Sequence, residues 1–444
     1  MTKRFTLCAA ASLLAFVVVN AEAITADEAL ARTLENNPTI RAATADLEQA
    51  SGRRLVLRAT GLPDVRVVVP GGVQGGKRAG EKSIQPFAFA RGALTQPLFN
   101  MAVPASFRRG NIEVLLARQR LNIAIMEQLH ATRVAFYTAA YNKSVGALAE
   151  AQHQRLQGNV VAQTDRYQAG QADRGALTVA RLLEEQMLPR VEEARRLDQG
   201  ALLKLAQTMG DDLGSNAKLP EVDGELQFAH VQVDAQSEAP AAVANRADLK
   251  LARLLVLAAR EDQRIAAAGY YPAISATISG DYIPVSDIRR GSEGSARRSD
   301  DIISSEARAG AAYTWNVIDN GRVGGEVAQR RAAREINELV LARLEADVPR
   351  ELTRIQNNLR ALDARQSALT KAVTAAEQTV AAVQNSLAQG LSSQLEYRTA
   401  ESSFLETKAG LLSVALEENV ARAEWDRATG RYFQFSDDSN GNVQ

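Results

Sequence analysis

The chain has 444 residues, of which 52 are basic and 52 acidic, so its formal charge is zero. The basic residues alternate with acids, which argues against a nucleic-acid partner. The three histidines lack metal-ligand spacing, and no nucleophile elbow, phosphate loop or paired carboxylates stand out, so we expect no enzyme, cofactor or metal site. Few aromatic residues and many Ala, Leu, Gln, Arg and Glu favour long helices over a compact mixed core.

The N-terminus has the pattern of an export signal. Two basic residues precede a mostly apolar run over residues 7–19, and residues 21–23 read Ala-Glu-Ala. We expect a signal peptide over residues 1–23, cleaved after Ala23, which also removes Cys8, the only cysteine. No other segment is long and apolar enough for a transmembrane helix. The exported protein is therefore expected to be either soluble or a β-barrel.

The first part of the mature chain predicts a helix followed by two strands. A capping box, Thr25-Ala-Asp-Glu28, opens the helix. Pro38 kinks or restarts it, and Gly61-Leu62-Pro63 ends it. Alternating side chains then predict strands at about 64–70 and 86–99, with a flexible, glycine-rich polar loop between them.

Two later segments, about Met101–Gly210 and Gly321–Gly430, predict long helical hairpins, because apolar residues recur at steps of three, four or seven. Each has a long arm of about 65 residues, or roughly 100 Å, a turn at Gly170 or Gly390, and a shorter return arm. The apolar stripe continues on both sides of Pro349, which predicts a bend there and not an end. On the stripes alone, a coiled-coil scaffold is the simplest interpretation.

The two halves align with each other, which predicts an internal two-fold repeat. The same offset separates Asn36 from Asn245 and Pro63 from Pro272, and a second offset separates the two turn glycines. We expect a first repeat over residues 24–210, an irregular linker over 211–240, a second repeat over 241–430 with strands at about 273–285 and 306–318, and a polar, disordered tail over 431–444.

Four strands per chain cannot close a barrel, and open sheet edges are not tolerated in lipid. If the strands enter a membrane, several chains must therefore share one barrel. The alternative is a soluble exported coiled-coil adaptor or scaffold protein. That alternative explains the helical stripes and the signal, but it does not explain two strand pairs at matched places in the repeats.

Several short motifs resemble those of the TolC-type outer-membrane efflux protein family, over about Ile24 to Gly430. Their order and their duplication in both halves are more specific than any single motif. They are Ala29-Leu30, Asn37-Pro38-Thr39-Ile40, Gly61-Leu62-Pro63, Leu94-Thr95-Gln96-Pro97-Leu98-Phe99-Asn100 with its echo Tyr313-Thr314-Trp315-Asn316-Val317-Ile318-Asp319-Asn320-Gly321, and Gln389-Gly390-Leu391-Ser392-Ser393-Gln394-Leu395-Glu396-Tyr397 followed by Ala400.

The resemblance implies a mainly α fold with a small β part: antiparallel helical hairpins in coiled-coil packing form an α-barrel, and each chain of a homotrimer gives four strands to a shared transmembrane β-barrel. It implies an outer-membrane exit channel with helices in the periplasm, which conducts substrates passively in a tripartite efflux or type I secretion system. The implied partners are a periplasmic adaptor (membrane fusion) protein, an inner-membrane pump of RND or ABC type, and outer-membrane lipid. The cargo is not implied.

The resemblance also places the pore aperture at the second hairpin. Glu396 matches an acidic pore-facing residue, whereas Thr399 replaces a second acid and Ser392 replaces a basic gate residue. A gate held by salt bridges is therefore not expected. Three copies of Glu396 around a narrow axis favour cations and raise one another's pKa; the alternative is an ordinary solvated helix residue.

The same resemblance assigns the two turns to the tip that docks on the adaptor. Gly170 and Gly390 mark these turns in the first and second hairpins. In the first turn, Asp173 and Arg174 are expected to cap a helix or to face the adaptor and not to line the pore.

Overall fold

The computed structural model describes residues 23–75, 84–211, 219–224, 226–282, 305–389 and 391–431. The predicted signal peptide, apart from Ala23, and the predicted tail from residue 432 onward lie outside the described residues. The chain divides into two compact units. Unit 1 comprises residues up to 38, 127–233 and 354–427, and unit 2 comprises residues 39–126, 234–353 and 428 onward. None of the helices in the described part combines the length and the apolarity needed to cross a bilayer.

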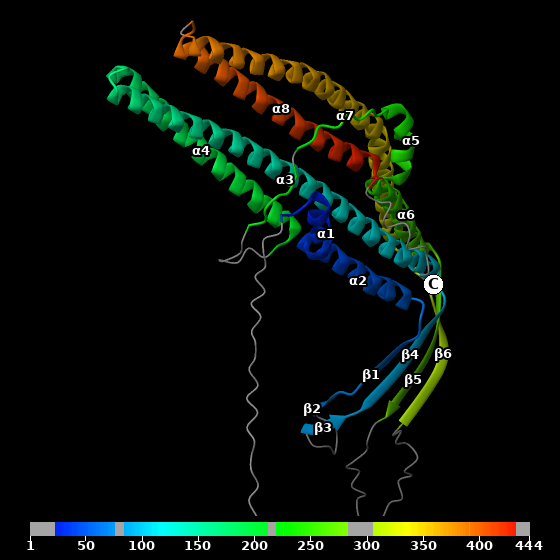
Figure 1. Ribbon diagram of the computed structural model, residues 1–444. Helices are drawn as coiled ribbons and strands as arrows, with labels where there is room; N and C mark the ends of the chain where they lie inside the picture. Colours follow the sequence, from blue (N-terminus) through cyan, green and yellow to red (C-terminus); the bar gives the residue numbers. More distant parts are fainter. Residues whose placement is uncertain are drawn as a thin grey trace, which may run out of the picture. The chain divides into compact units, whose positions relative to one another are not determined.

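Both halves of the chain contain similar elements in the same order (Figure 1). The long helices α3 and α7 have 67 residues each, and the return helices α4 and α8 have 36 each. These equal lengths confirm the predicted mainly helical fold with a two-fold repeat. The first half consists of α1 (Ala26–Asn36), α2 (Pro38–Ala59), β1 (Asp64–Val68), β2 (Gly71–Gly75), β3 (Ile84–Ala88), β4 (Ala90–Phe99), α3 (Ala102–Gln168) and α4 (Arg174–Met209). The second half consists of α5 (Ala235–Asn245), α6 (Ala247–Ala267), β5 (Ala273–Tyr282), β6 (Ser305–Thr314), α7 (Arg322–Ala388) and α8 (Gln394–Thr429), with a 3-10 turn (Ala268–Tyr270) after α6.

A core cluster of unit 1 gathers side chains of α1, α3 and α4. Half of its buried members are alanines, whose small side chains let helix backbones approach closely. Leu205 and Met209 of α4 are fully buried there, and each contributes about 1.5–3 kcal/mol by burial. The N-terminal end of the described chain is also held in this core, because the Ile24 amide donates a 2.7 Å hydrogen bond to Glu221 O.

In unit 1, a side chain at the junction between α1 and α2 supplies a hydrogen-bond donor to a backbone carbonyl at the end of α4. The last carbonyls of a helix have no partner within that helix. Buried Asn37 donates a 2.7 Å hydrogen bond from Nδ2 to Thr208 O, and Gly210 caps α4 with a φ of 79°. In unit 2, Arg246 stands at the equivalent place between α5 and α6, and its Nη1 donates to Ala428 O of α8 at 3.4 Å. The repeat therefore uses the same joint twice: a side-chain donor between the two short helices bonds a carbonyl at the end of the return helix.

Unit 2 carries an antiparallel sheet in the order β1-β4-β5-β6. The pairing of β4 with β5 joins strands from the two halves of the chain, with Leu94 opposite Ile278. Strands β1 and β6 are the edges of this sheet. A separate two-stranded sheet is formed by β2 and β3.

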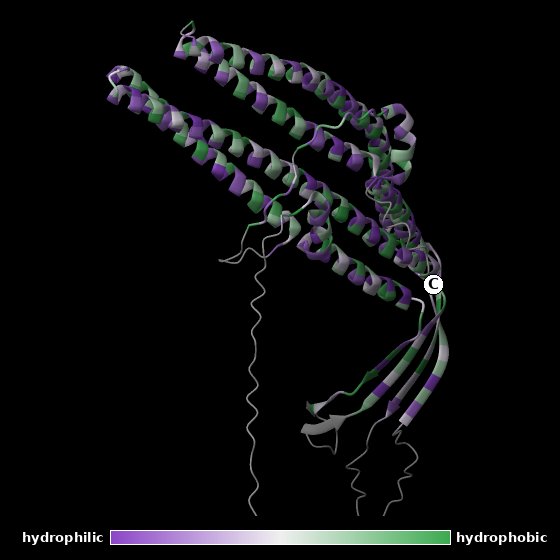
Figure 2. Ribbon diagram, in the orientation of Figure 1, coloured by the Kyte–Doolittle hydropathy of each residue, from purple (hydrophilic) through white to green (hydrophobic). Residues whose placement is uncertain are grey.

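The register gives the four-stranded sheet two different faces. Side chains on successive residues alternate between the faces, and the alternation shows as changes of colour along the strands in Figure 2. The apolar face is exposed in the single chain, with Val67 at 68% and Tyr313 at 62%. The apolar face carries Val65, Val67, Leu94, Ile274, Ile278, Tyr282 and Tyr313. The polar face carries Asp64, Arg66, Arg91, Thr95, Ser275, Thr277, Ser279, Asp281, Glu306 and Arg308.

Strand boundaries differ from the sequence prediction. Strands β2 and β3 occupy both ends of the segment predicted as a loop, because the chain continues to pair beyond β1 and β4, with Gly71 opposite Ala88. Strand β6 stops at Thr314 and not at residue 318, and Ile318 is 85% exposed. The chain turns instead toward α7, where the Asp319 carboxylate accepts the Val323 amide at 2.8 Å.

The start of α5 and the course of α7 at Pro349 also bear on predictions made from the sequence. The segment predicted as irregular, residues 211–240, gives way to α5 at Ala235, because the Asp234 carboxylate accepts the amides of the first turn and caps the helix. Pro240 lies inside that helix. Helix α7 continues through Pro349 without ending, as the uninterrupted apolar stripe indicates.

We expect Gly210→Ala to destabilise the protein by about 1–3 kcal/mol, because an L side chain is strained at positive φ. Its Cβ would also lie 2.7 Å from Asn36 O. The matched control is Gly200→Ala, where the Cβ would meet open space within α4 and where alanine should stabilise by about 0.5–1 kcal/mol. Thermal unfolding followed by far-UV circular dichroism measures both, and equal midpoints for the two variants would contradict the proposed joint.

Candidate functional site

Two turns close the hairpins, and both belong to unit 1. In the first turn, Gly170 has a φ of 70°, and its amide and the following amide bond back to the end of α3 at 3.0 and 2.8 Å. This pair of bonds is the Schellman arrangement that ends a helix with glycine. Asp173 then caps α4, since its Oδ1 accepts the Ala176 amide at 2.7 Å. Arg174 is the exposed first residue of α4.

The second turn has the same backbone bond but a different cap. The Leu391 amide bonds to Ser386 O at 2.8 Å, while Gly390 lies outside the described residues. Ser393 stands where Asp173 stands in the first turn. Its amide donates to the Glu396 carboxylate at 2.8 Å, and its hydroxyl accepts the Glu396 amide at 3.2 Å. These reciprocal bonds form a capping box at the start of α8.

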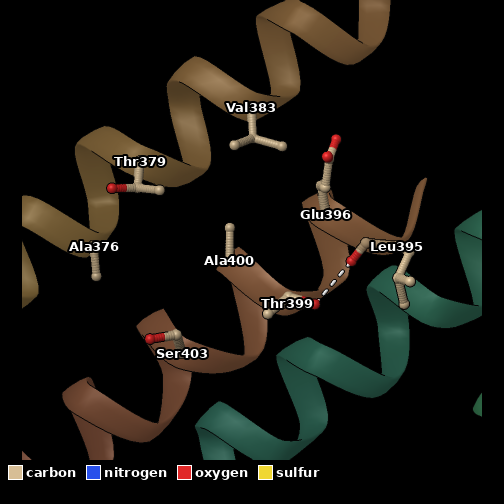
Figure 3. A pocket seen from close by; sticks show the side chains of 8 residues that line it. All are labelled: Ala376, Thr379, Val383, Leu395, Glu396, Thr399, Ala400 and Ser403. Atoms are coloured by element: carbon tan, nitrogen blue, oxygen red, sulfur yellow. Dashed lines mark hydrogen bonds between the residues drawn. The ribbon is translucent and has the colours of Figure 1, made fainter. Parts of the chain in front are cut away.

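Glu396 is fully exposed but held in one position. Its Oε2 accepts a 2.5 Å hydrogen bond from the Ser392 hydroxyl as well as the Ser393 amide bond. The Ser392 hydroxyl first, and then the Ser393 amide, lower the pKa of Glu396 below its usual value. One turn further along α8, the Thr399 hydroxyl donates a 3.0 Å hydrogen bond to Leu395 O (Figure 3).

Of the three residues predicted for the aperture, the structure therefore brings Ser392 and Glu396 together and leaves Thr399 bonded to its own helix. The capping role of Glu396 was not predicted from the sequence. The signal that could have found it is the Ser-x-x-Glu spacing from Ser393 to Glu396, which is that of a capping box.

A groove of about 500 Å³ lies between α7 and α8 next to this turn (Figure 3). Val383 and Ala400 point toward one another across it. Glu396 is its single charged lining residue, so the groove has no second carboxylate or histidine to act as an acid–base partner. The lining residues are Ala376, Thr379, Val383, Leu395, Glu396, Thr399, Ala400 and Ser403.

Ion pairs connect α3 of the first hairpin to α8 of the second within unit 1. Arg155 Nη1 lies 3.1 Å from Glu401 Oε1, and Arg133 Nη1 lies 2.9 Å from Asp426 Oδ2. Exposed pairs of this kind contribute about 0–1 kcal/mol each. Their main effect is to set which turns of the two helices face each other. No sequence pattern identifies them, because the partners are more than two hundred residues apart.

A segment of unit 1 that follows α4, which we call the strap (residues 219–224 and 226–233), lies against α3, α7 and α8. Helix side chains hold its backbone: Lys143 Nζ donates to Val222 O at 2.6 Å, and Asn419 Nδ2 donates to Gln227 O at 2.9 Å. His230 of the strap pairs with Asp363 of α7. The strap thus links the two hairpins of the unit.

Near the strap, α8 buries a carboxyl group. Glu418 is 2% exposed, and neither carboxylate oxygen has a hydrogen bond of ordinary geometry. Burial raises the pKa of Glu418. Two groups offset this rise only in part: Arg422, whose Nε lies 3.6 Å from Glu418 Oε1, and the Ala229 backbone. A buried charge without full compensation destabilises the fold.

Comparison with known proteins identifies relatives of this architecture. Residues 29–211 and 239–431 match the family model described as outer membrane efflux protein. No curated protein matches the sequence. Three solved structures share the fold at low identity. They are the CmeC outer membrane channel of Campylobacter jejuni (TM-score 0.77, 13% identity, 91% of this chain and 85% of that chain), the outer membrane protein VceC of Vibrio cholerae (0.73, 17%, 91% and 96%), and the open state of the MtrE outer membrane channel of Neisseria gonorrhoeae (0.72, 17%, 91% and 88%).

We expect Glu418→Gln to stabilise the protein at neutral pH by about 1–3 kcal/mol, because it removes a buried, poorly compensated charge. A group whose pKa is raised by folding favours the native state when it is protonated. The advantage of the variant should therefore be absent in acid, below the unfolded pKa of a glutamate, and should grow as the pH rises through the raised native pKa.

Unfolding midpoints across the acid-to-neutral range measure this effect. Glu417→Gln is the matched control, because Glu417 is exposed and pairs with Arg365 at the surface, so its removal should change stability by less than about 1 kcal/mol. If Glu418→Gln lowered the midpoint, and did so increasingly as the pH rose, the buried carboxylate would be a stabilising partner, contrary to this account.

Proposed function

Because the chain belongs to the outer membrane efflux protein family, we propose that it is the outer-membrane exit channel of a tripartite efflux or type I secretion system. It conducts substrates passively across the periplasm and the outer membrane. The observation that carries the proposal is the four-stranded sheet, which has an exposed apolar face, a polar face and two edges. An apolar face of this kind suits lipid, and a polar face suits a water-filled lumen.

Closure of this sheet requires several copies of the chain, and we propose the homotrimer that the family resemblance implies. Among the described strands, β1 and β6 each pair on one side only. Their free edges are not tolerated in lipid, so they must pair with the edges of other copies. A barrel of about eight strands is filled by its own side chains, whereas one of about 16–18 leaves an aqueous channel. Three chains give twelve strands, a number between these two sizes.

The long helices supply the periplasmic part of the channel. Helices α3 and α7, at 67 residues each, are about 100 Å long. In the trimer, the hairpins pack as an α-barrel. Their turns, which include Gly170, Asp173, Arg174 and Gly390, dock on a periplasmic adaptor and an inner-membrane pump. A signal peptide cleaved after Ala23 directs export of the chain.

The aperture lies at the second turn in this proposal. Three copies of the Ser392–Glu396 pair surround the axis, and in each chain the Ser392 hydroxyl lowers the Glu396 pKa, which opposes the rise that three neighbouring carboxylates cause in one another. A ring of carboxylates favours cations. Ser392 stands in place of the family's basic gate residue and Thr399 in place of its second acid, so salt bridges do not hold this ring closed. The aperture opens when the adaptor moves the hairpins apart.

Two substitutions of Glu396 separate its charge from its capping role. Glu396→Gln keeps a side chain that fits a capping box but removes the charge, whereas Glu396→Ala removes both the charge and the capping bond and should loosen the first turn of α8. We expect both variants to weaken the cation preference of single channels in planar bilayers at low salt. Only the alanine variant should speed hydrogen exchange at the start of α8.

If Glu396→Gln assembled normally and kept the wild-type ion preference, the carboxylate would serve only as a helix cap, and the constriction would lie elsewhere. If the wild-type trimer formed no conducting steps at all, the channel itself would be excluded.

A further inference from the structure

Four helix segments of unit 2 are ordered by the sheet to which they connect. Helix α2 leads into β1, β4 continues into α3, α6 leads into β5, and β6 leads into α7. Because the strands pair in the order β1-β4-β5-β6, these helices form a row in the order α2-α3-α6-α7. Helices α2 and α7 are therefore the two ends of the row, as β1 and β6 are the edges of the sheet.

Side-chain contacts confirm each step of the row. Every neighbouring pair of helices is joined by a polar contact between side chains, so α3 occupies the inner side of α2 and α6 occupies the inner side of α7. The contacts are Arg120 Nη1 to Asp46 Oδ2 at 3.5 Å (α3 to α2), Arg109 Nε to Asp262 Oδ1 at 2.9 Å (α3 to α6) and Arg334 Nη1 to Gln263 Oε1 at 3.0 Å (α7 to α6).

The outer sides of the two end helices carry exposed apolar residues. Asp46 marks the inner side of α2, and Leu55, which follows it by nine residues, lies about 180° around the helix and is 60% exposed. Arg334 marks the inner side of α7, and Ile336, which follows it by two residues, lies about 200° around the helix and is 61% exposed. We call these two outer surfaces the seams. The α2 seam consists of Gly52, Leu55, Val56 and Ala59, and the α7 seam consists of Ala332, Ile336 and Leu339, all of them exposed.

Both seams are the parts of the outer sides that lie nearest the sheet. Farther from the sheet the outer sides become charged, with Arg41 and Glu48 on α2 and with Arg343 and Arg350 on α7. Exposed apolar surface that is bordered by charged residues in this way is typical of a surface that another protein covers.

The proposed channel supplies a second copy of the chain as the occupant of both seams, and the inference rests on that function. In the channel, β1 of one copy pairs with β6 of the next. Only residues 60–63 separate α2 from β1, and only residues 315–321 separate β6 from α7. Pairing of the two strand edges therefore brings α2 of one copy beside α7 of the next. The two helices run antiparallel, because α2 runs toward the sheet and α7 runs away from it.

We propose that α2 and α7 form a helical subunit interface, in which the α2 seam of one copy packs antiparallel against the α7 seam of the next. Such a contact joins two different surfaces of the chain, so it repeats from copy to copy and closes into a ring. It removes apolar side chains from water. The interface therefore stabilises the trimer on the periplasmic side of the membrane, in addition to the hydrogen bonds between strand edges.

Helix pairing inside the chain indicates which residues of the two seams meet. Gln263 lies ten residues before Ala273, the first residue of β5, and it contacts Arg334, which lies twenty residues after the end of β6. Gly52 lies twelve residues before the start of β1, so the same offset places it near Ile336 of the next copy. The Cβ position of Gly52 has no neighbouring atom within 4 Å in the single chain, so a larger side chain of the next copy fits there.

The test is disulfide cross-linking of the purified protein. Gly52→Cys is combined in turn with Ala332→Cys, Ile336→Cys and Leu339→Cys. We expect at least one of these pairs to give reducible species with the masses of two and three chains on non-reducing gels. Within one chain the two seams are three helix spacings apart, or roughly 25 Å, which a disulfide does not span. A bond between the seams must therefore join two chains.

The matched control is Gly52→Cys combined with Arg330→Cys. Arg330 is exposed and precedes Leu339 by nine residues, which places it on the opposite side of α7. This pair should give no cross-linked species. The single-cysteine variants control for Cys8, the natural cysteine of the chain.

The outcomes separate the helical interface from the channel. Variants that assemble as trimers but cross-link in none of the three seam pairs, or that cross-link as strongly in the control pair, would overturn the interface and leave the proposed function standing. Cross-linked species that contain a different protein would also overturn it. Wild-type protein that forms neither trimers nor conducting steps would overturn the proposed function, and the interface with it.

Discussion

The constraint on which this structure depends is an antiparallel sheet that is incomplete in one chain. Its apolar face is exposed, with Val65 and Val67 more than half accessible, and its edges are β1 and β6. Exposed apolar faces and free strand edges promote association in water. In lipid, the same edges must be closed by hydrogen bonds. In the channel that we propose, further copies complete the sheet, and the oligomer is then part of the fold.

The helices meet a different constraint, because a helix end buried without partners is unstable. The repeat solves it by placing a donor between its two short helices. Asn37 serves this purpose for α4, and Arg246 serves it for α8. Arg246 also pairs with Asp248 and Glu351 at 2.8 and 2.5 Å, so the second joint is charged where the first is neutral. A guanidinium near the C-terminus of a helix is favoured by the helix dipole as well.

Much of the fold is predictable from the sequence, because helical stripes and repeat offsets are local patterns. The continuation of α7 through Pro349 and the cap at Thr25 follow from neighbours a few residues away. The ends of strands are less predictable. Glycine-rich β2 and proline-containing β3 pair only because β1 and β4 bring them together, and this pairing depends on tertiary context.

The candidate site is predictable only in part, for the same reason. The position of Glu396 follows from a motif, but its hydroxyl and amide bonds depend on the geometry of the turn. Glu418 reads as an ordinary helix glutamate, and its burial appears only once α8 is packed in unit 1. The charged residues on the polar face of the sheet look like scattered strand residues until the register brings Arg91 beside Asp281.

The most direct test of the central claim is a cryo-electron microscopy structure of the purified protein in lipid nanodiscs. The account predicts three chains around a three-fold axis, with β1 of each chain hydrogen-bonded to β6 of its neighbour. It also predicts that the apolar face carrying Val67 and Ile278 meets lipid and that the face carrying Arg66 and Arg308 meets the lumen. A particle with unpaired β1 and β6 edges, or with these two faces reversed, would contradict it.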